Sequence, residues 1–408
     1  MLFKREKYLK KIRPFYHSGD IIKVITGVRR CGKSSLMEMI ADEIRQNGVT
    51  EDNIIYLDLD KRENRKIKTP DQLETLIESK MKGDGLHYLF IDEVQNVTGF
   101  EEVINGFRSD GGFSIFITGS NSYLLSGELV TKLTGRYLEF ELFTLSFEEY
   151  EQMKEFYGKP VDSNLSVELN QYILEGGFPR TVQIDELTAK RTYVAGVVNE
   201  IFEKDIRRRV KIKDKAAFET VRDYVINNFG ATMSIKSLTE ALEKSGIKIS
   251  RATVTKYITA LVDAKILYEC SRFDMKSKKA LAGEKKYYLA DLSFYFARNT
   301  DNRINFGPVL ENIVYIYSRS LDYAVSVGRI GKFECDFILR NIENDYSYVQ
   351  VAYTIMQSED TENREYRPLE RVHDNYAKYV ATTDYTLQKR NGIKHINLMQ
   401  FMMSESKF

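Results

Sequence analysis

The sequence predicts an α/β protein built around a parallel sheet, and three observations lead to this expectation. Between residues 21 and 143, short apolar runs alternate with helical stretches, which is typical of a parallel sheet with helices on both faces. A glycine-rich turn joins the first of these runs directly to an amphipathic helix. From residue 307 onward a helix is followed by further strands, so we expect a second, smaller α/β part.

The composition fits a folded protein in a reducing compartment. At 408 residues the chain suggests two or three domains, and 43% hydrophobic with 29% charged residues is typical of a soluble protein. We find no signal peptide and no run of about 18 apolar residues that would span a membrane. The three cysteines and four histidines are scattered, without the spacing of a disulfide framework or a metal site. We therefore expect a cytoplasmic protein with no membrane partner.

Changes in pattern divide the chain into four expected parts. The α/β core spans residues 1–145, with its apolar strands at 21–26, 54–60, 87–93, 114–120 and 137–143. Residues 146–230 lose strand character and are expected to be helical, interrupted at Gly176, Gly177 and Pro179. A small basic part at 231–295 and the second α/β part at 296–408 complete the chain.

The first strand runs into residues 27–34, GVRRCGKS, which match the P-loop pattern G-x-x-x-x-G-K-[ST]. The glycines let backbone N–H groups surround phosphate, Lys33 reaches the β- and γ-phosphates, and the Ser34 hydroxyl ligates Mg²⁺. The helix that follows directs its positive end at the phosphates. Arg29 and Arg30 either meet phosphate or project into solvent. We expect ATP with Mg²⁺ to bind to Gly27, Val28, Arg29, Arg30, Cys31, Gly32, Lys33, Ser34 and Ser35.

A second apolar strand, residues 87–93, ends in two carboxylates. In this Walker B pattern Asp92 holds the Mg²⁺ shell and Glu93 orients or deprotonates the attacking water. The alternative for Glu93 is a plain helix cap, since strand-end carboxylates also serve that purpose. Ser120 and Asn121 follow a third strand, where they are either a γ-phosphate sensor or an ordinary polar turn.

These motifs resemble a prokaryotic ATPase family between the AAA+ and STAND groups, whose members carry a C-terminal domain of uncharacterised function. The resemblance runs in order over nearly the whole chain. It is carried by GVRRCGKSS (27–35), LFIDEVQ (89–95), FITGSNSYLLS (116–126), LTGRYLEFELFTLSFEEY (133–150), EGGFPR (175–180), EKDIRRR (203–209) and the stretch from GPVLENIVY to YVATTD near the C-terminus.

The resemblance adds two site residues. Pro179, in Gly177-Phe178-Pro179, is similar to the lid motif that packs against adenine in STAND-type ATPases. Arg136 stands where the family carries an arginine that acts as a finger or sensor on the γ-phosphate, in its own site or a neighbour's. The alternative for Arg136 is a salt bridge to Glu139 or Glu141.

The basic part has the pattern of a winged helix. Residues 232–290 hold twelve Lys/Arg against six Asp/Glu. Ser237-x-x-Glu240 predicts a capping box at the start of one helix, and Ser250 caps a second, whose polar face shows Arg251, Thr255, Lys256 and Thr259. A hairpin follows, with a basic wing of Lys276, Lys278, Lys279, Lys285 and Lys286. The pattern indicates nucleic-acid contact, although winged helices also serve as protein-interaction modules and ATPase lids.

The C-terminal part resembles the PD-(D/E)xK nucleases, with a catalytic lysine missing. Glu311 on a helix and Asp336 on a strand suit Mg²⁺ binding. Gln350 replaces the second strand carboxylate, and Ala352 replaces the lysine. Lys378 could substitute for the lysine alone, but with both groups lost we expect an inactive nuclease-like fold.

The expected fold is therefore a P-loop NTPase sheet with a helical lid, a winged helix and a restriction-endonuclease-like α/β domain. The expected function is an ATP-hydrolysing switch or motor, with Lys33, Glu93 and Arg136 in catalysis and Ser34 and Asp92 on Mg²⁺. Expected partners are ATP, nucleic acid, and a protein partner or a second copy. The rival hypotheses are a DNA-binding regulator with negligible turnover, an active ATP-dependent nuclease, and a protein-sensing switch.

Overall fold

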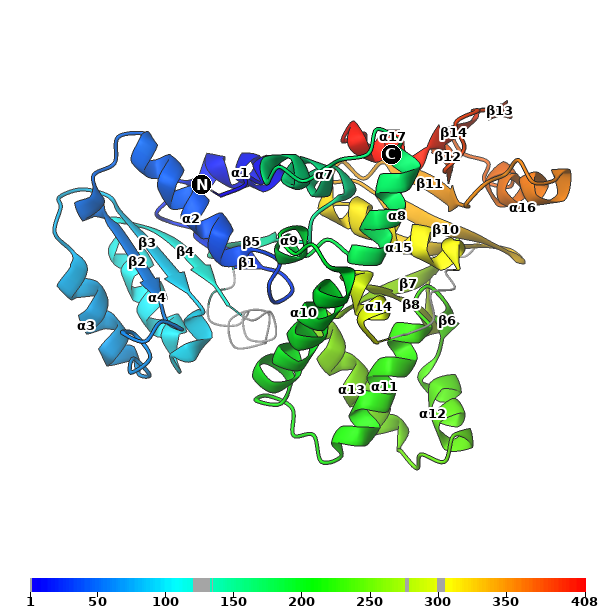
Figure 1. Cartoon of the computed structure of the whole chain (residues 1–408). Coiled ribbons are helices and arrows are strands. Elements are labelled where there is room, and N and C mark those ends of the chain that lie inside the picture. The colour runs from blue at the N-terminus through cyan, green and yellow to red at the C-terminus, as the bar shows by residue number, and fades with distance from the viewer. Residues whose placement is uncertain (1, 120–132, 134, 276–278, 299–304) are drawn as a thin grey trace. The chain divides into compact units, whose positions relative to one another are not determined.

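The computed structural model describes residues 2–119, 133, 135–275, 279–298 and 305–408 (Figure 1). The chain divides into two compact units, Met1–Phe143 and Thr144–Phe408. Ser120 and Asn121 lie outside the described residues, as do Lys276 and Lys278. Within the described ranges, no helix is long and apolar enough to cross a membrane.

The first unit contains a five-stranded sheet whose neighbouring strands are all parallel, in the order β2-β3-β4-β1-β5. This confirms the predicted parallel α/β architecture. The strands are β1 (Ile22–Thr26), β2 (Ile54–Asp58), β3 (His87–Asp92), β4 (Phe113–Thr118) and β5 (Tyr137–Glu141).

Helices cover the sheet of the first unit because alternate strand residues point to opposite faces. Val24, Leu57 and Leu89 join one core cluster with apolar residues of α3 and α4. On the other face, Phe116 stacks on Phe90 and meets the edge of Tyr16. The helices are α1 (Glu6–Ile12), α2 (Lys33–Gln46), α3 (Pro70–Lys80) and α4 (Phe100–Asp110).

The second unit begins with helices, as the loss of strand pattern after residue 146 predicts. They are α7 (Phe147–Phe156), α8 (Leu165–Glu175), α9 (Pro179–Val182), α10 (Leu187–Glu200), the π-helical turn η4 (Ile201–Ile206) and α11 (Lys215–Asn227). A buried ion pair between Lys154 of α7 and Glu168 of α8, at 2.7 Å, fixes the first two against each other.

The basic segment folds into a helix pair and a hairpin, as predicted. These are α12 (Ile235–Lys244), α13 (Arg251–Asp263), β7 (Leu267–Asp274) and β8 (Lys279–Leu289), with the short strand β6 (Thr232–Met233) before them. Ser250 caps α13 as expected. The predicted cap of α12 was wrong: Ser234 is the N-cap, and Ser237 is the third helical residue whose hydroxyl accepts from the Ser234 N–H at 3.0 Å. A capping box therefore forms one helical turn earlier than the Ser237-x-x-Glu240 pattern indicates.

One nine-stranded sheet joins this hairpin to the C-terminal strands, in the order β13-β14-β12-β11-β10-β9-β7-β8-β6. The junction is a parallel pairing of β7 with β9, where Phe273 lies opposite Gly328. The remaining elements are α14 (Ser293–Arg298), α15 (Phe306–Ser320), β9 (Ala324–Ile330), β10 (Phe333–Arg340), β11 (Tyr346–Val351), α16 (Glu359–Glu370), β12 (Ala377–Thr382), β13 (Lys389–Arg390), β14 (Ile393–Asn397) and α17 (Leu398–Met403). The division into four parts remains a prediction.

Candidate nucleotide-binding site

The loop between β1 and α2 has a backbone that only glycine accommodates at its first position. Gly27 has φ 140°, and a Cβ there would overlap the carbonyl oxygen of Leu142. Gly32, with φ 108°, lets the chain turn into α2. Lys33, the first residue of α2, is buried, and its ammonium donates to the Gly27 carbonyl at 2.9 Å and the Val28 carbonyl at 3.3 Å. The lysine therefore lies inside the loop, where its ammonium could donate hydrogen bonds to a phosphate.

A residue that the sequence analysis missed supports the loop from behind. The Arg5 guanidinium donates to the carbonyls of Cys31, at 3.3 Å, and Phe143, at 2.7 Å. Arg5 is almost fully buried, so it ties the N-terminal segment to both sides of the loop. Cys31 is fully buried, and burial raises the pKa of its thiol, so Cys31 acts as an apolar packing residue. The basic N-terminal sequence carries no signal that would single out Arg5.

The remaining loop residues face outward to different extents. Ser34 and Arg30 are exposed, whereas Ser35 and Arg29 are half-buried. Arg30 has φ 69°, a left-handed conformation that a non-glycine residue rarely adopts. The roles assigned to these residues remain predictions.

Asp92 lies at the same edge of the sheet as the loop. It is the last residue of β3, and β4 separates it from β1. Adjacent strands lie about 4.8 Å apart, so two strand spacings put the Asp92 and Thr26 backbones about 10 Å from each other. Thr118, at the end of β4, lies between them and donates its hydroxyl proton to the Asp92 carboxylate. Thr118 is a second residue that the sequence analysis missed. The sequence feature that could have identified it is a hydroxyl residue at the end of an apolar strand.

Glu93 follows Asp92 in a left-handed conformation, with φ 57°. Its N–H donates to the Thr118 hydroxyl at 3.2 Å, and its carboxylate accepts from the Gln95 amide. Within the described residues, the Glu93 side chain makes no capping bond to the short helix Val94–Asn96, so the helix-cap alternative is not what the geometry shows. The amide oxygen of Gln95 is buried, and it has no hydrogen-bond partner in the part of the chain that the structure describes.

The structure does not bring Arg136 to the loop of its own chain. The Arg136 carbonyl accepts from Ile22, at the start of β1, whereas the loop follows the end of β1. Five strand residues at about 3.3 Å each separate the two ends by roughly 16 Å, beyond the reach of an arginine side chain. Arg136 is exposed and donates to Asn105 at 3.3 Å. The expected alternative is a salt bridge to Glu139 or Glu141. Among the described residues the Glu139 pair is not seen, and the Glu139 carboxylate accepts from the Thr26 hydroxyl at 2.7 Å.

Pro179 belongs to the second unit, where it begins α9. Asp291 lies against both glycines of the same motif. The Gly177 N–H donates to the Asp291 carboxylate at 2.8 Å, and a Cβ on Gly176 would overlap that carboxylate. Burial raises the pKa of Asp291. The EGGFPR motif therefore has a structural role within the second unit. The lid role expected of Pro179 remains a prediction.

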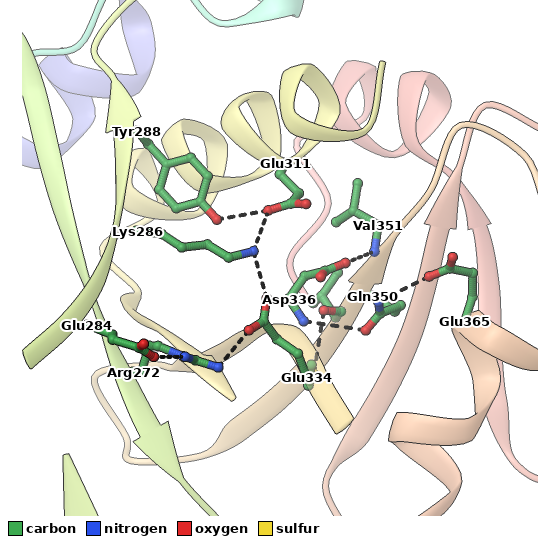
Figure 2. A network of polar contacts seen from close by, with 12 residues as sticks. Arg272, Glu284, Lys286, Tyr288, Glu311, Glu334, Asp336, Gln350, Val351 and Glu365 are labelled. Carbon is green, nitrogen blue, oxygen red and sulfur yellow. Dashed lines mark hydrogen bonds and ion pairs between the residues drawn. The ribbon is translucent and has the colours of Figure 1, made fainter. Parts of the chain in front are cut away.

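Residues of the expected nuclease-like part form a buried polar network with Lys286 and Tyr288 of β8, which belong to the expected basic part (Figure 2). The Lys286 ammonium lies 3.0 Å from the Glu311 carboxylate and 2.9 Å from that of Glu334. The Tyr288 hydroxyl also donates to Glu311, at 3.0 Å. Asp336 accepts from the Val351 N–H at 2.8 Å, and both burial and the nearby Glu311 charge raise its pKa well above the ordinary value.

This network corrects one part of the expected wing. Lys286 is 5% exposed and its ammonium lies between the Glu311 and Glu334 carboxylates, so it does not belong to a basic surface. Lys285 lies 2.6 Å from the Glu269 carboxylate. Lys286 comes from β8 and places a positive charge beside Glu311, one of the residues expected to suit Mg²⁺ binding.

The other nuclease positions are also engaged. Gln350 donates to Glu365 at 3.0 Å, and Ala352 is buried in a core cluster. Lys378 donates to the Asp374 carbonyl at 2.9 Å, so it does not replace the missing lysine. Among the described residues, no group of three or more His, Cys, Asp or Glu side chains is arranged to hold a metal ion.

Comparison with known proteins agrees with the geometry of the first unit. Residues 20–151 match a family described as an AAA domain, and residues 166–302 match a domain of unknown function (DUF8612). An uncharacterised protein of Haemophilus influenzae is 33% identical over 408 residues, covering 98% of this chain and 99% of that protein. The uncharacterised protein MJ1544 of Methanocaldococcus jannaschii is 30% identical over 360 residues, covering 86% of this chain and 78% of that protein.

Among solved structures, the Walker-type ATPase PABY2304 of Pyrococcus abyssi is similar in fold, with a TM-score of 0.51 and 16% identity. The match covers 72% of this chain and 95% of that chain. The AAA-type P-loop fold that the sequence predicts is confirmed.

Proposed function

Because this chain belongs to the same family as the uncharacterised proteins of Haemophilus influenzae and Methanocaldococcus jannaschii and carries an AAA domain, we propose that it is an ATP-hydrolysing switch coupled to nucleic acid. The observation that carries the proposal is that Lys33 and Asp92 lie at the same edge of a parallel sheet. Ligands of open α/β sheets bind at the carboxyl ends of the strands, which is where both residues lie.

The loop residues fit a triphosphate. The backbone N–H groups of the Gly27–Lys33 turn and the start of α2 offer donors and a positive dipole end to phosphate oxygens. The Lys33 ammonium, which donates to two loop carbonyls, exchanges these acceptors for phosphate oxygens at little reorganisation. Bound Mg²⁺ would neutralise phosphate charge, and Ser34 and Asp92 are the residues that would hold it.

Glu93 is the residue we assign to water activation. Thr118 contacts both the Asp92 carboxylate and the Glu93 backbone, so one hydroxyl fixes the metal-holding residue and the base together. The Gln95 amide N–H donates to the Glu93 carboxylate and orients it, and the buried Gln95 oxygen is suited to accept a hydrogen bond from a water. Arg136 is too far from the loop of its own chain to act there. A catalytic role for Arg136 would therefore require self-association, with the arginine reaching the nucleotide site of a second copy.

The nucleic-acid coupling rests on the second unit. The order of α11, β6, α12, α13, β7 and β8 is that of a winged helix, with α13 in the place of the recognition helix. We propose that the C-terminal part is an inactive nuclease-like domain, because Lys286 supplies the positive charge that a metal would bring. Pro179 is proposed to act as the lid residue against adenine.

The test is the steady-state ATPase rate with Mg²⁺, with and without duplex DNA, beside Glu93→Gln. A single catalytic acid–base group contributes about 10²–10⁴-fold, so the variant should lose at least about a hundredfold in kcat while still binding ATP. Stimulation by DNA supports the coupled switch. No turnover in the unaltered protein would overturn hydrolysis and leave a nucleotide-binding module.

A second candidate partner is a protein. Tyr353 and Met356 follow β11, and Tyr385 and Leu387 follow the parallel strand β12, and all four are exposed. The carboxyl ends of adjacent parallel strands lie at one edge of the sheet, so these apolar side chains gather there. A rate indifferent to DNA would favour this protein-sensing alternative.

A further inference from the structure

The segment between η4 and α11 is a run of exposed cations. Over residues 207–213 it carries Arg207, Arg208, Arg209, Lys211 and Lys213, all of them exposed. We call these five residues the basic strip. It lies outside the helix pair and the hairpin, in a part of the chain for which the winged-helix pattern assigns no function.

The basic strip runs along α13. The Lys256 ammonium, on the exposed face of α13, donates to the Lys211 carbonyl at 3.1 Å. One residue further along α13, the Tyr257 hydroxyl donates to the Asp214 carbonyl at 3.4 Å. At the other end of the strip, Arg209 acts electrostatically on Asp263, the last residue of α13. The basic strip and α13 are therefore adjacent segments, and both carry exposed cations.

Among the described residues, ion pairs neutralise the cations of the hairpin more fully than those of the basic strip. Lys285 pairs with Glu269, Lys286 with Glu311 and Glu334, and Arg272 with Glu284 and Glu334. On the strip, Arg207 lies 2.9 Å from the Glu203 carboxylate, and Arg209 acts electrostatically on Asp263. In the described part of the chain, Arg208, Lys211, Lys213 and Arg251 of α13 have no carboxylate partner.

We infer that the basic strip and the exposed face of α13 form one binding surface for the phosphate backbone of duplex DNA, with α13 directed at the major groove. This inference rests on the nucleic-acid coupling proposed above and deepens it. A helix fits the roughly 12 Å wide major groove of B-DNA, whereas the major groove of A-form RNA is too narrow and deep for side chains to read. Cations beside the recognition helix then reach the flanking phosphates, which set affinity and its salt dependence.

The test compares two triple variants of the full chain that remove the same charge. The first, Arg208→Ala with Lys211→Ala and Lys213→Ala, empties the basic strip of three cations that have no carboxylate partner in the described residues. The control, Lys332→Ala with Arg340→Ala and Lys407→Ala, removes three exposed cations elsewhere in the second unit. Binding to a fluorescent duplex is measured by anisotropy from low to moderate salt, and binding of a fluorescent ATP analogue is measured in parallel.

Each phosphate contact contributes about 0.9 to the slope of log Kobs against log salt, so the strip variant should lose roughly 2.7 of that slope. The control should keep the slope of the unaltered protein. A third variant, Glu203→Gln, leaves Arg207 without its neutralising carboxylate and should bind duplex more tightly than the unaltered protein. This gain cannot come from misfolding.

Equal slopes in the strip variant and the control would overturn the inference, and so would equal binding of duplex RNA and duplex DNA. Failure of all proteins to bind duplex, with the ATP analogue still bound, would overturn the DNA surface and leave the nucleotide site standing. Failure to bind the ATP analogue, with duplex binding and its slopes as expected, would instead overturn the proposed ATP switch alone.

Discussion

The buried network around Lys286 makes a sharp prediction about stability. Lys286→Met keeps most of the side-chain length but removes the ammonium that lies between Glu311 and Glu334. Breaking a buried ion pair by removing one partner leaves an uncompensated charge and costs about 3–5 kcal/mol. We expect the free energy of unfolding of the second unit to fall by that amount near neutral pH.

The penalty should grow with pH. Burial raises the pKa of Glu311, and burial together with Glu311 raises that of Asp336. A carboxyl group whose folded pKa lies above its unfolded value binds more protons in the folded state, so it favours folding at low pH and loses that contribution as pH rises through the folded pKa. Without the ammonium this loss is larger, because each charged carboxylate faces the others alone.

The assay is urea unfolding at about pH 5 and about pH 8, followed by circular dichroism. Lys285→Met is the matched control: its pair with Glu269 is 39% and 33% exposed, and exposed pairs contribute at most about 1 kcal/mol. Equal destabilisation by the two variants would refute the reasoning. So would a Lys286→Met penalty that is the same at both pH values, since it would show that no carboxylate in the network depends on the ammonium.

Two further predictions concern the nucleotide site. Gly27→Ala should abolish binding of a fluorescent ATP analogue, because its Cβ overlaps the Leu142 carbonyl and its φ of 140° is strained; unchanged affinity would show that the loop has another conformation. Thr118→Val removes the hydroxyl that contacts Asp92 and Glu93, and we expect kcat to fall about 10–100-fold, the range for lost support of metal-site residues. Its binding of the nucleotide without Mg²⁺ should not change, and a fall in that affinity would place Thr118 in binding instead.

The sequence predicts the features of this protein that depend on local pattern. The P-loop can be predicted because the strand, the glycine turn and the helix are contiguous in the sequence. Asp92 can be predicted because an apolar run ends in an acidic residue. The order of helices and hairpin in the basic segment can also be predicted, because these elements follow one another in the sequence.

Features that depend on pairing between distant segments were not predicted. Lys286 looks like a wing cation, because its carboxylate partners are on α15 and β10 and only the sheet brings them together. The register of β5 against β1, which places Arg136 at the far edge, has no sequence signature, so the sequence leaves open whether this arginine serves its own site or a neighbour's. The role of Arg5 could not be predicted because its hydrogen-bond partners are backbone carbonyls, which every sequence contains.

The parallel pairing of β7 with β9 has a consequence for how the chain is made. During synthesis β7 and β8 emerge before β9, with α14 and α15 between them, so one edge of β7 stays open until the later strand arrives. An open edge pairs readily with other chains, and parallel, non-local pairing forms slowly. The 166–302 segment shared with other proteins stops before β9 and keeps that edge open. The segment that recurs among proteins is therefore smaller than the segment that pairs both edges of β7.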